Sequence, residues 1–161
     1  MSNSQSMCTS FLGELLSATH NFSSSNPAHT ANTADTFKAA LYTTTASPAL
    51  NAATTAYSSS GEVSGTGYTA GGIAVTNATN PTSSNSSSTA GVGYWTPSGN
   101  LVYSTVTLTT AFDTVLIYNS TQSNKAVSVH TFGSQTITAG TFTLTMPSNT
   151  TTTALLRLST T

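Results

Sequence analysis

The chain has 161 residues, enough for one ordinary domain with a sizeable buried core. Only 4% of the residues are Asp, Glu, Lys or Arg, against about 25% in average globular proteins, and the formal net charge is −1. Three cations are too few for a basic patch, so we expect no nucleic-acid partner. The scarcity of ionisable side chains also argues against an enzyme, because acid–base catalysis draws mostly on them.

Serine and threonine, with 26 and 35 residues, take the place of the missing charges. We therefore expect a surface of hydroxyls, amides and backbone groups, with little net charge to oppose self-association. The single cysteine, Cys8, allows no intrachain disulfide and is expected to be an inert thiol in an N-terminal arm. No stretch approaches the ~18 apolar residues of a membrane span and no secretion signal is recognisable, so no membrane contact is expected.

The first elements in chain order are an arm and a helix. Residues 1–9 are polar and are expected to form a flexible arm. Apolar residues then recur at helical spacing, which predicts a helix over about residues 10–20. Its apolar stripe must be buried against the fold or a neighbouring subunit, which makes it the candidate packing or partner interface. The stripe consists of Phe11, Leu12, Leu15 and Leu16.

The middle of the chain alternates between polar segments and short strands. A connector at 23–35 leads to residues 37–43, which alternate between two faces and predict a strand. The glycines of 58–72 predict an irregular loop with positive φ values. Residues 80–90 are nearly all Ser, Thr, Asn and Pro, which predicts an exposed loop.

The C-terminal part contains most of the strand signals, separated by turn signals such as residues 97–100. Many short strands, abundant β-branched threonine and little helix predict an all-β fold. We expect a single β-sandwich or jelly-roll-like domain over residues 10–161, with one short N-terminal helix. The predicted strands are 92–96, 101–109, 112–118, 126–132, 135–138, 141–146 and 154–159.

No motif identifies a catalytic site. Residues 65–71 have the glycines of a dinucleotide-binding loop, but the spacing is wrong and no acidic residue follows at the required distance. Asp113 and His130 can be combined with one of many serines into a triad, yet no nucleophile elbow is present. No spacing among the histidines or carboxylates selects a metal site or a glycosidase pair. We therefore predict no catalytic, cofactor-binding or metal-ligating residue, and no cofactor.

Aromatic residues leave a carbohydrate-binding interpretation open. Tyr94, Trp95 and Tyr103 fall in predicted strands and offer a platform on which a sugar ring stacks. Aromatic residues at strand positions are more often part of the core.

Six stretches carry a resemblance, and residues 62–72, Glu-Val-Ser-Gly-Thr-Gly-Tyr-Thr-Ala-Gly-Gly, are the most distinctive of them. Together they resemble a family of small β-rich virion structural proteins of tailed bacteriophages, over about residues 11–159. The polar segments 23–35 and 80–90 look like additions to the pattern. The other stretches are 11–16 with 20–22, 36–43, 116–119 with 123–127, 139–143, and 154–158.

The resemblance implies a non-enzymatic virion protein, made in the host cytoplasm, with no catalytic residue to carry over. The leading expectation is a capsid decoration (cement) protein that binds the major capsid protein, stabilises the head lattice and forms a homo-oligomer such as a trimer. One alternative is a tail, neck or fibre component that binds other virion proteins. Another is a host-surface carbohydrate-binding module.

Overall fold

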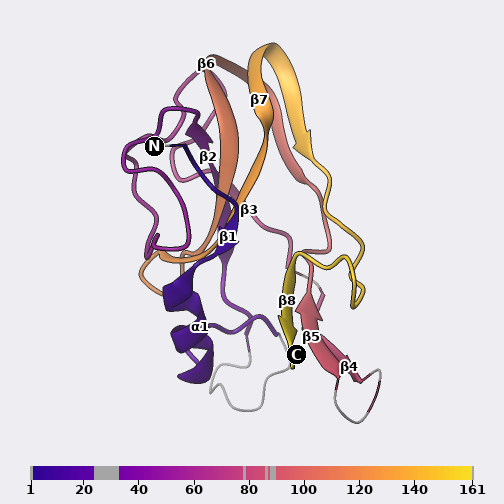
Figure 1. Cartoon of the computed structure of the whole chain (residues 1–161). Coiled ribbons are helices and arrows are strands. Elements are labelled where there is room, and N and C mark those ends of the chain that lie inside the picture. Colours follow the sequence, from indigo (N-terminus) through magenta and orange to yellow (C-terminus); the bar gives the residue numbers. More distant parts are fainter. Residues whose placement is uncertain (1, 24–32, 78, 86, 88–89, 161) are drawn as a thin grey trace.

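The computed structural model describes residues 2–23, 33–77, 79–85, 87 and 90–160, which form one short helix and eight strands (Figure 1). As the sequence predicts, the fold is an all-β, sandwich-like domain with two antiparallel sheets. In the described residues, one sheet has the order β1-β7-β6-β2-β3 and the other β4-β5-β8. The elements are β1 (Ser6–Met7), α1 (Thr9–Leu16), β2 (Phe37–Thr43), β3 (Ile73–Ala74), β4 (Thr82–Asn85), β5 (Gly91–Trp95), β6 (Leu101–Asn119), β7 (Lys125–Leu144) and β8 (Leu156–Ser159).

β6 and β7 form one long antiparallel hairpin, where the sequence predicted five separate strands. The pairing continues through several register shifts, and Thr105 and Ala139 adopt positive φ values of 55° and 48°. Such irregularities bend a strand and increase its twist without ending it. The hairpin consequently folds over on itself, as the turn of both ribbons at the top of Figure 1 shows.

The two halves of the bent hairpin enclose an aromatic core. Phe112 packs edge-on against Phe142 with ring centroids 5.0 Å apart, and Phe132 lies 5.3 Å from Phe142. The hydroxyl of Tyr103 donates to the carbonyl of Ala39 at 2.8 Å. This hydrogen bond joins the first half of β6 to β2. β2 pairs with β6 along its whole length and has the predicted bounds.

The glycine-rich segment 61–72 covers the outer edges of β2 and of the first half of β6. The N–H of Val63 donates to the carbonyl of Leu41, and the N–H of Thr107 donates to the carbonyl of Thr66. The segment is therefore the irregular loop that its glycines predict. It binds backbone groups of β2 and β6 that would otherwise be exposed at the edges of these strands.

Glycine is required where this loop touches the strands. Gly72 has a φ of +72°, and a Cβ there would lie 1.8 Å from the carbonyl oxygen of Ala39. At Gly65, a Cβ would lie 2.0 Å from the carbonyl oxygen of Thr107. Only a residue without a side chain allows two backbones to approach so closely.

The N-terminal residues pair with the rest of the fold, so the flexible arm expected over residues 1–9 is wrong, and with it the placement of Cys8 in an arm. The N–H of Ser4 donates to the carbonyl of Leu50, and β1 pairs with Val129 and Ser128 of β7. Pairing of β1 brings Cys8 into the core, where its side chain is fully buried. Burial is the main cause that raises the pKa of Cys8 to about 12, and the nearby Glu14 carboxylate adds to it. The thiol therefore stays protonated, which fits the expected inert thiol.

α1 is shorter than the predicted helix over residues 10–20. Ala18 has a positive φ of 54°, and the N–H of Thr19 donates to the carbonyl of Glu14. The N–H of Ala18 also donates to the carbonyl of Leu15, which completes a Schellman ending. The helix therefore ends at Leu16.

The polar segment 80–90 contains a strand that the sequence did not predict. β4 pairs with β5, and all four of its side chains are exposed. Exposure agrees with the prediction for this segment. Its strand conformation comes from the backbone pairing with β5, which the sequence of the segment does not show. Residues 86 and 88–89 lie outside the described residues, as do residues 24–32 of the predicted connector.

The contact of Gly72 with β2 yields a stability prediction. Gly72→Ala is expected to lower the free energy of unfolding by about 3 kcal/mol or more, because the strained φ and the backbone clash act together. Gly133→Ala is the control, since a Cβ there meets nothing within 4 Å, and its effect should stay within about 1 kcal/mol. Urea unfolding midpoints measure both, and equal midpoints would contradict the loop contact.

Candidate partner interface

The structure divides the predicted stripe of α1 into an inner and an outer side. Phe11 is 1% exposed and Leu15 packs half-buried against the core. Leu12 is 43% exposed and Leu16 is 93% exposed. The stripe is therefore only half covered, because a short surface helix contacts the fold with one side. Leu12 and Leu16 are left for water or for a partner.

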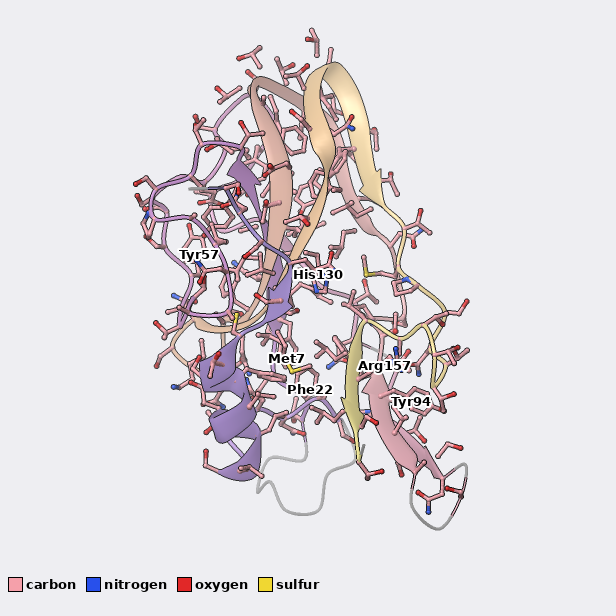
Figure 2. The ribbon with its side chains drawn as sticks, viewed as in Figure 1. Met7, Phe22, Tyr57, Tyr94, His130 and Arg157 are labelled. Carbon is pink, nitrogen blue, oxygen red and sulfur yellow. The ribbon has the colours of Figure 1, made fainter. Side chains whose placement is uncertain are left out.

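An apolar groove of about 110 Å³ lies between α1 and the small sheet, and its wall is formed by apolar atoms. Figure 2 shows Met7 and Phe22 in the space between α1 and β8. Phe11 and Leu15 line the groove from the helix, and Leu158, 46% exposed, lines it from β8. We name the groove together with Leu12, Leu16 and Leu158 the attachment surface.

Trp95 forms part of the groove wall and is held rigidly. Its Nε1 donates to Asn77 Oδ1 at 3.1 Å and to the carbonyl of Thr79 at 2.8 Å. Its ring lies 4.8 Å from that of Phe22. Trp95 is 3% exposed, and Tyr103 is 2% exposed in the large sheet. These two aromatic residues belong to the core, as aromatic residues in strands usually do.

A buried polar network fixes α1 against the turn between β6 and β7. Lys125 Nζ donates to Glu14 Oε1 at 2.7 Å, and His20 Nε2 donates to Glu14 Oε2 at 2.7 Å. Burial alone would raise the pKa of Glu14, but the hydrogen bonds from Lys125 and His20 and the charge of Lys125 outweigh it and lower that pKa. The carboxylate thus stays ionised and binds the helix to β7 and to the chain after the helix.

The network continues through Asn119 to Asp35. Asn119 Nδ2 donates to His20 Nδ1 at 2.9 Å and to Asp35 Oδ2 at 2.7 Å. Its Oδ1 accepts the backbone N–H groups of Thr121 and Gln122, so the amide orientation is determined. His20 Nδ1 is therefore an acceptor, and the ring is assigned as the neutral tautomer that carries its proton on Nε2.

Glu62 is similarly occupied inside the glycine-rich loop. Its Oε1 accepts the hydroxyl of Tyr68 at 2.7 Å and the N–H of Gly71 at 2.8 Å, and its Oε2 accepts the hydroxyl of Tyr57 at 2.7 Å. Burial, together with these hydrogen bonds to Glu62, raises the pKa of Tyr57 and Tyr68. The phenols remain protonated donors, and the carboxylate holds the loop in place.

The two residues of the triad hypothesis have other partners. Asp113 Oδ1 accepts Asn3 Nδ2 at 3.1 Å and the hydroxyl of Thr114 at 2.7 Å. His130 Nε2 lies 2.9 Å from Ser128 Oγ, and burial lowers the pKa of His130 to about 4. Ser128 is itself 1% exposed. Over the described residues, no carboxylate hydrogen-bonds to His130, so the geometry does not assemble a triad.

Among the described residues, no three His, Cys, Asp or Glu side chains lie close enough together to hold a metal ion. Within the same part of the chain, no helix is long and apolar enough to cross a membrane.

Comparison of the chain with models of known protein families, with curated proteins and with solved structures found no match. The interpretation of the attachment surface therefore rests on the residues of this chain. The groove itself could not be read from the sequence, because it combines α1 with residues from both sheets. Only the apolar spacing of the helix pointed toward it.

The division of the helical stripe can be tested by truncating its residues. Phe11→Ala is expected to lower the free energy of unfolding by about 3–5 kcal/mol, as for buried Phe in other cores. Leu16→Ala should change it by no more than about 0.5 kcal/mol, because its side chain is exposed. Chemical unfolding measures both variants. A large loss for Leu16→Ala would mean that the helix packs with its other side.

The ionised state of Glu14 leads to a prediction on acid stability. A carboxylate with a lowered pKa in the folded state stabilises the fold above its unfolded pKa, and this stability is lost as the pH falls through the folded value. The ordinary pKa of a glutamate side chain is 4.5. The wild type should therefore lose stability as the pH falls below 4.5 and through the lower pKa of Glu14 in the folded state. Glu14→Gln should be less stable at pH 7 and show a flatter decline, measured as unfolding midpoints from pH 7 to pH 3. Parallel declines would count against the network.

Proposed function

We propose that this chain is a non-enzymatic structural protein of a bacteriophage particle, a capsid decoration protein that binds the major capsid protein through the attachment surface. The observation that carries the proposal is an apolar groove lined by the exposed Leu158, together with the exposure of Leu12 and Leu16 on the helix that forms one wall of the groove. Exposed apolar patches of this kind on soluble proteins mark sites of interaction with other proteins.

The internal use of charges supports an apolar mode of attachment. Glu14, Asp35 and Glu62 are occupied by hydrogen bonds inside the fold, and Lys125 is paired with Glu14. A partner therefore meets mainly leucines, hydroxyls and backbone groups. Such contacts are weak singly, so repeated copies on a lattice would supply the avidity that a firm attachment needs.

A tail, neck or fibre component of the same particle would use the same surface and remains the alternative. The number of copies separates the two locations, since a lattice binds many copies and a neck or tail binds few. We expect quantitative mass spectrometry of purified particles to give a copy number close to that of the major capsid protein or a simple fraction of it. A copy number near a dozen would contradict the capsid location.

Attachment should depend on the exposed leucines. In a retention assay on particles, Leu12→Ser with Leu16→Ser is expected to weaken binding at least about tenfold, since burying one leucine contributes about 1.5–3 kcal/mol. Val102→Ser is the control, because Val102 is 44% exposed on β6 and does not line the groove. Equal retention of both variants would refute this use of the attachment surface.

Attachment should also be nearly independent of salt. Particles washed at low salt and at about 1 M sodium chloride, where the Debye length shrinks to roughly 3 Å, are expected to retain equal amounts of the protein. Release at high salt would show that charges dominate the contact and would overturn the apolar mode.

A further inference from the structure

The edges of the described strands differ in how they are protected. β1 and β3 have two residues each, and β4 and β8 have four each. Short edge strands give little template for pairing with another chain. The outer edges of β2 and of the first half of β6 are covered by the glycine-rich loop 61–72. These edges are therefore either too short or already occupied.

The second half of β7 is the exception. β1 pairs only with Ser128 and Val129, so the edge continues uncovered to Leu144. Over the described residues, two backbone groups of residues 133–144 hydrogen-bond outside the β6–β7 ladder, and neither bond comes from another strand at this edge. The N–H of Ala139 donates to Thr107 Oγ1 of β6, and the carbonyl of Gly133 accepts from the side chain of Gln135. The edge is thus a long row of backbone donors and acceptors open to another strand.

This edge also lacks the residues that usually prevent pairing. Natural edge strands carry Lys, other inward charges, Pro or β-bulges, which hinder an approaching strand. Of these, the segment has only the register shifts between Gln135 and Gly140 and the positive φ of Ala139. The sequence has no Asp, Glu, Lys or Arg between Lys125 and Arg157, and no Pro within 133–144. The outward side chains are hydroxyls instead, with Thr136, Thr138 and Thr141 among those exposed.

We infer that residues 133–144 of β7 pair antiparallel with the same residues of a second copy of this chain, so that the two large sheets continue into one. A single edge related by a two-fold axis is self-complementary, since residue i of one copy meets residue j of the other and residue j of the first meets residue i of the second. The near-zero net charge opposes this association only weakly. Backbone hydrogen bonds would supply affinity, as in other cases of strand addition.

The inferred occupant is a closed dimer, because the pairing uses the free β7 edge of both copies. It refines the self-association expected from composition and does not involve the attachment surface. Loss of particle binding and loss of dimerisation are therefore separate results: leucine variants test the first, and β7 variants test the second.

The experiment compares two charge-matched double variants by analytical ultracentrifugation over micromolar to millimolar concentrations. Thr136→Lys with Thr141→Lys places cations on the free edge, where they face each other across the two-fold axis, because this pairing sets residue 136 of one copy opposite residue 141 of the other. Ser104→Lys with Thr109→Lys places the same charges on exposed positions of β6, one strand away from the edge. We expect the wild type and the β6 variant to dimerise, and the dimer of the β7 variant to be at least tenfold weaker.

Hydrogen exchange of the wild type provides a test that needs no variant. Amides within 133–144 should gain protection when the concentration rises above the dimer dissociation constant, while those of β4, the exposed edge of the small sheet, should not change. This measurement tests the inferred pairing of residues 133–144 even if the β7 variant does not fold. A wild type that stays monomeric, forms a trimer, or dimerises without new protection in β7 would overturn the inference.

Discussion

The pairing of β6 with β7 is the constraint on which the rest of the structure depends. Every other strand of the large sheet builds on this hairpin: β1 adds to β7, and β2 adds to β6 and carries β3. Register shifts and two positive φ values bend the hairpin without breaking it. The bend brings Phe112, Phe132 and Phe142 together, so a single ribbon supplies both walls of the aromatic core.

A second constraint is the small number of charged residues, and the fold uses most of them internally. Glu14 and Asp35 share one network with His20 and Asn119, and Glu62 anchors the glycine-rich loop. A buried carboxylate without such partners would cost several kcal/mol, so these hydrogen bonds are conditions for burial rather than a gain in stability. The exterior is consequently left to hydroxyls, amides and a few leucines.

The same network explains why α1 presents leucines to the outside. Glu14 binds Lys125 on β7, which determines the side of the helix that faces the sheet. Phe11 and Leu15 follow inward, whereas Leu12 and Leu16 are turned outward. An internal ion pair thus decides which part of an apolar stripe becomes core and which becomes the attachment surface.

Local sequence patterns determined the class of the fold, the short N-terminal helix and β2 with its bounds, because alternation and helical spacing are properties of consecutive residues. The glycines of 58–72 likewise predicted an irregular loop. Tertiary structure decided that five predicted strands are two bent ones, that Cys8 lies in the core and that β4 is a strand. It also decided which leucines stay exposed and which edge stays open. These features depend on contacts between residues far apart in the chain, and no spacing within one segment encodes what another segment will cover.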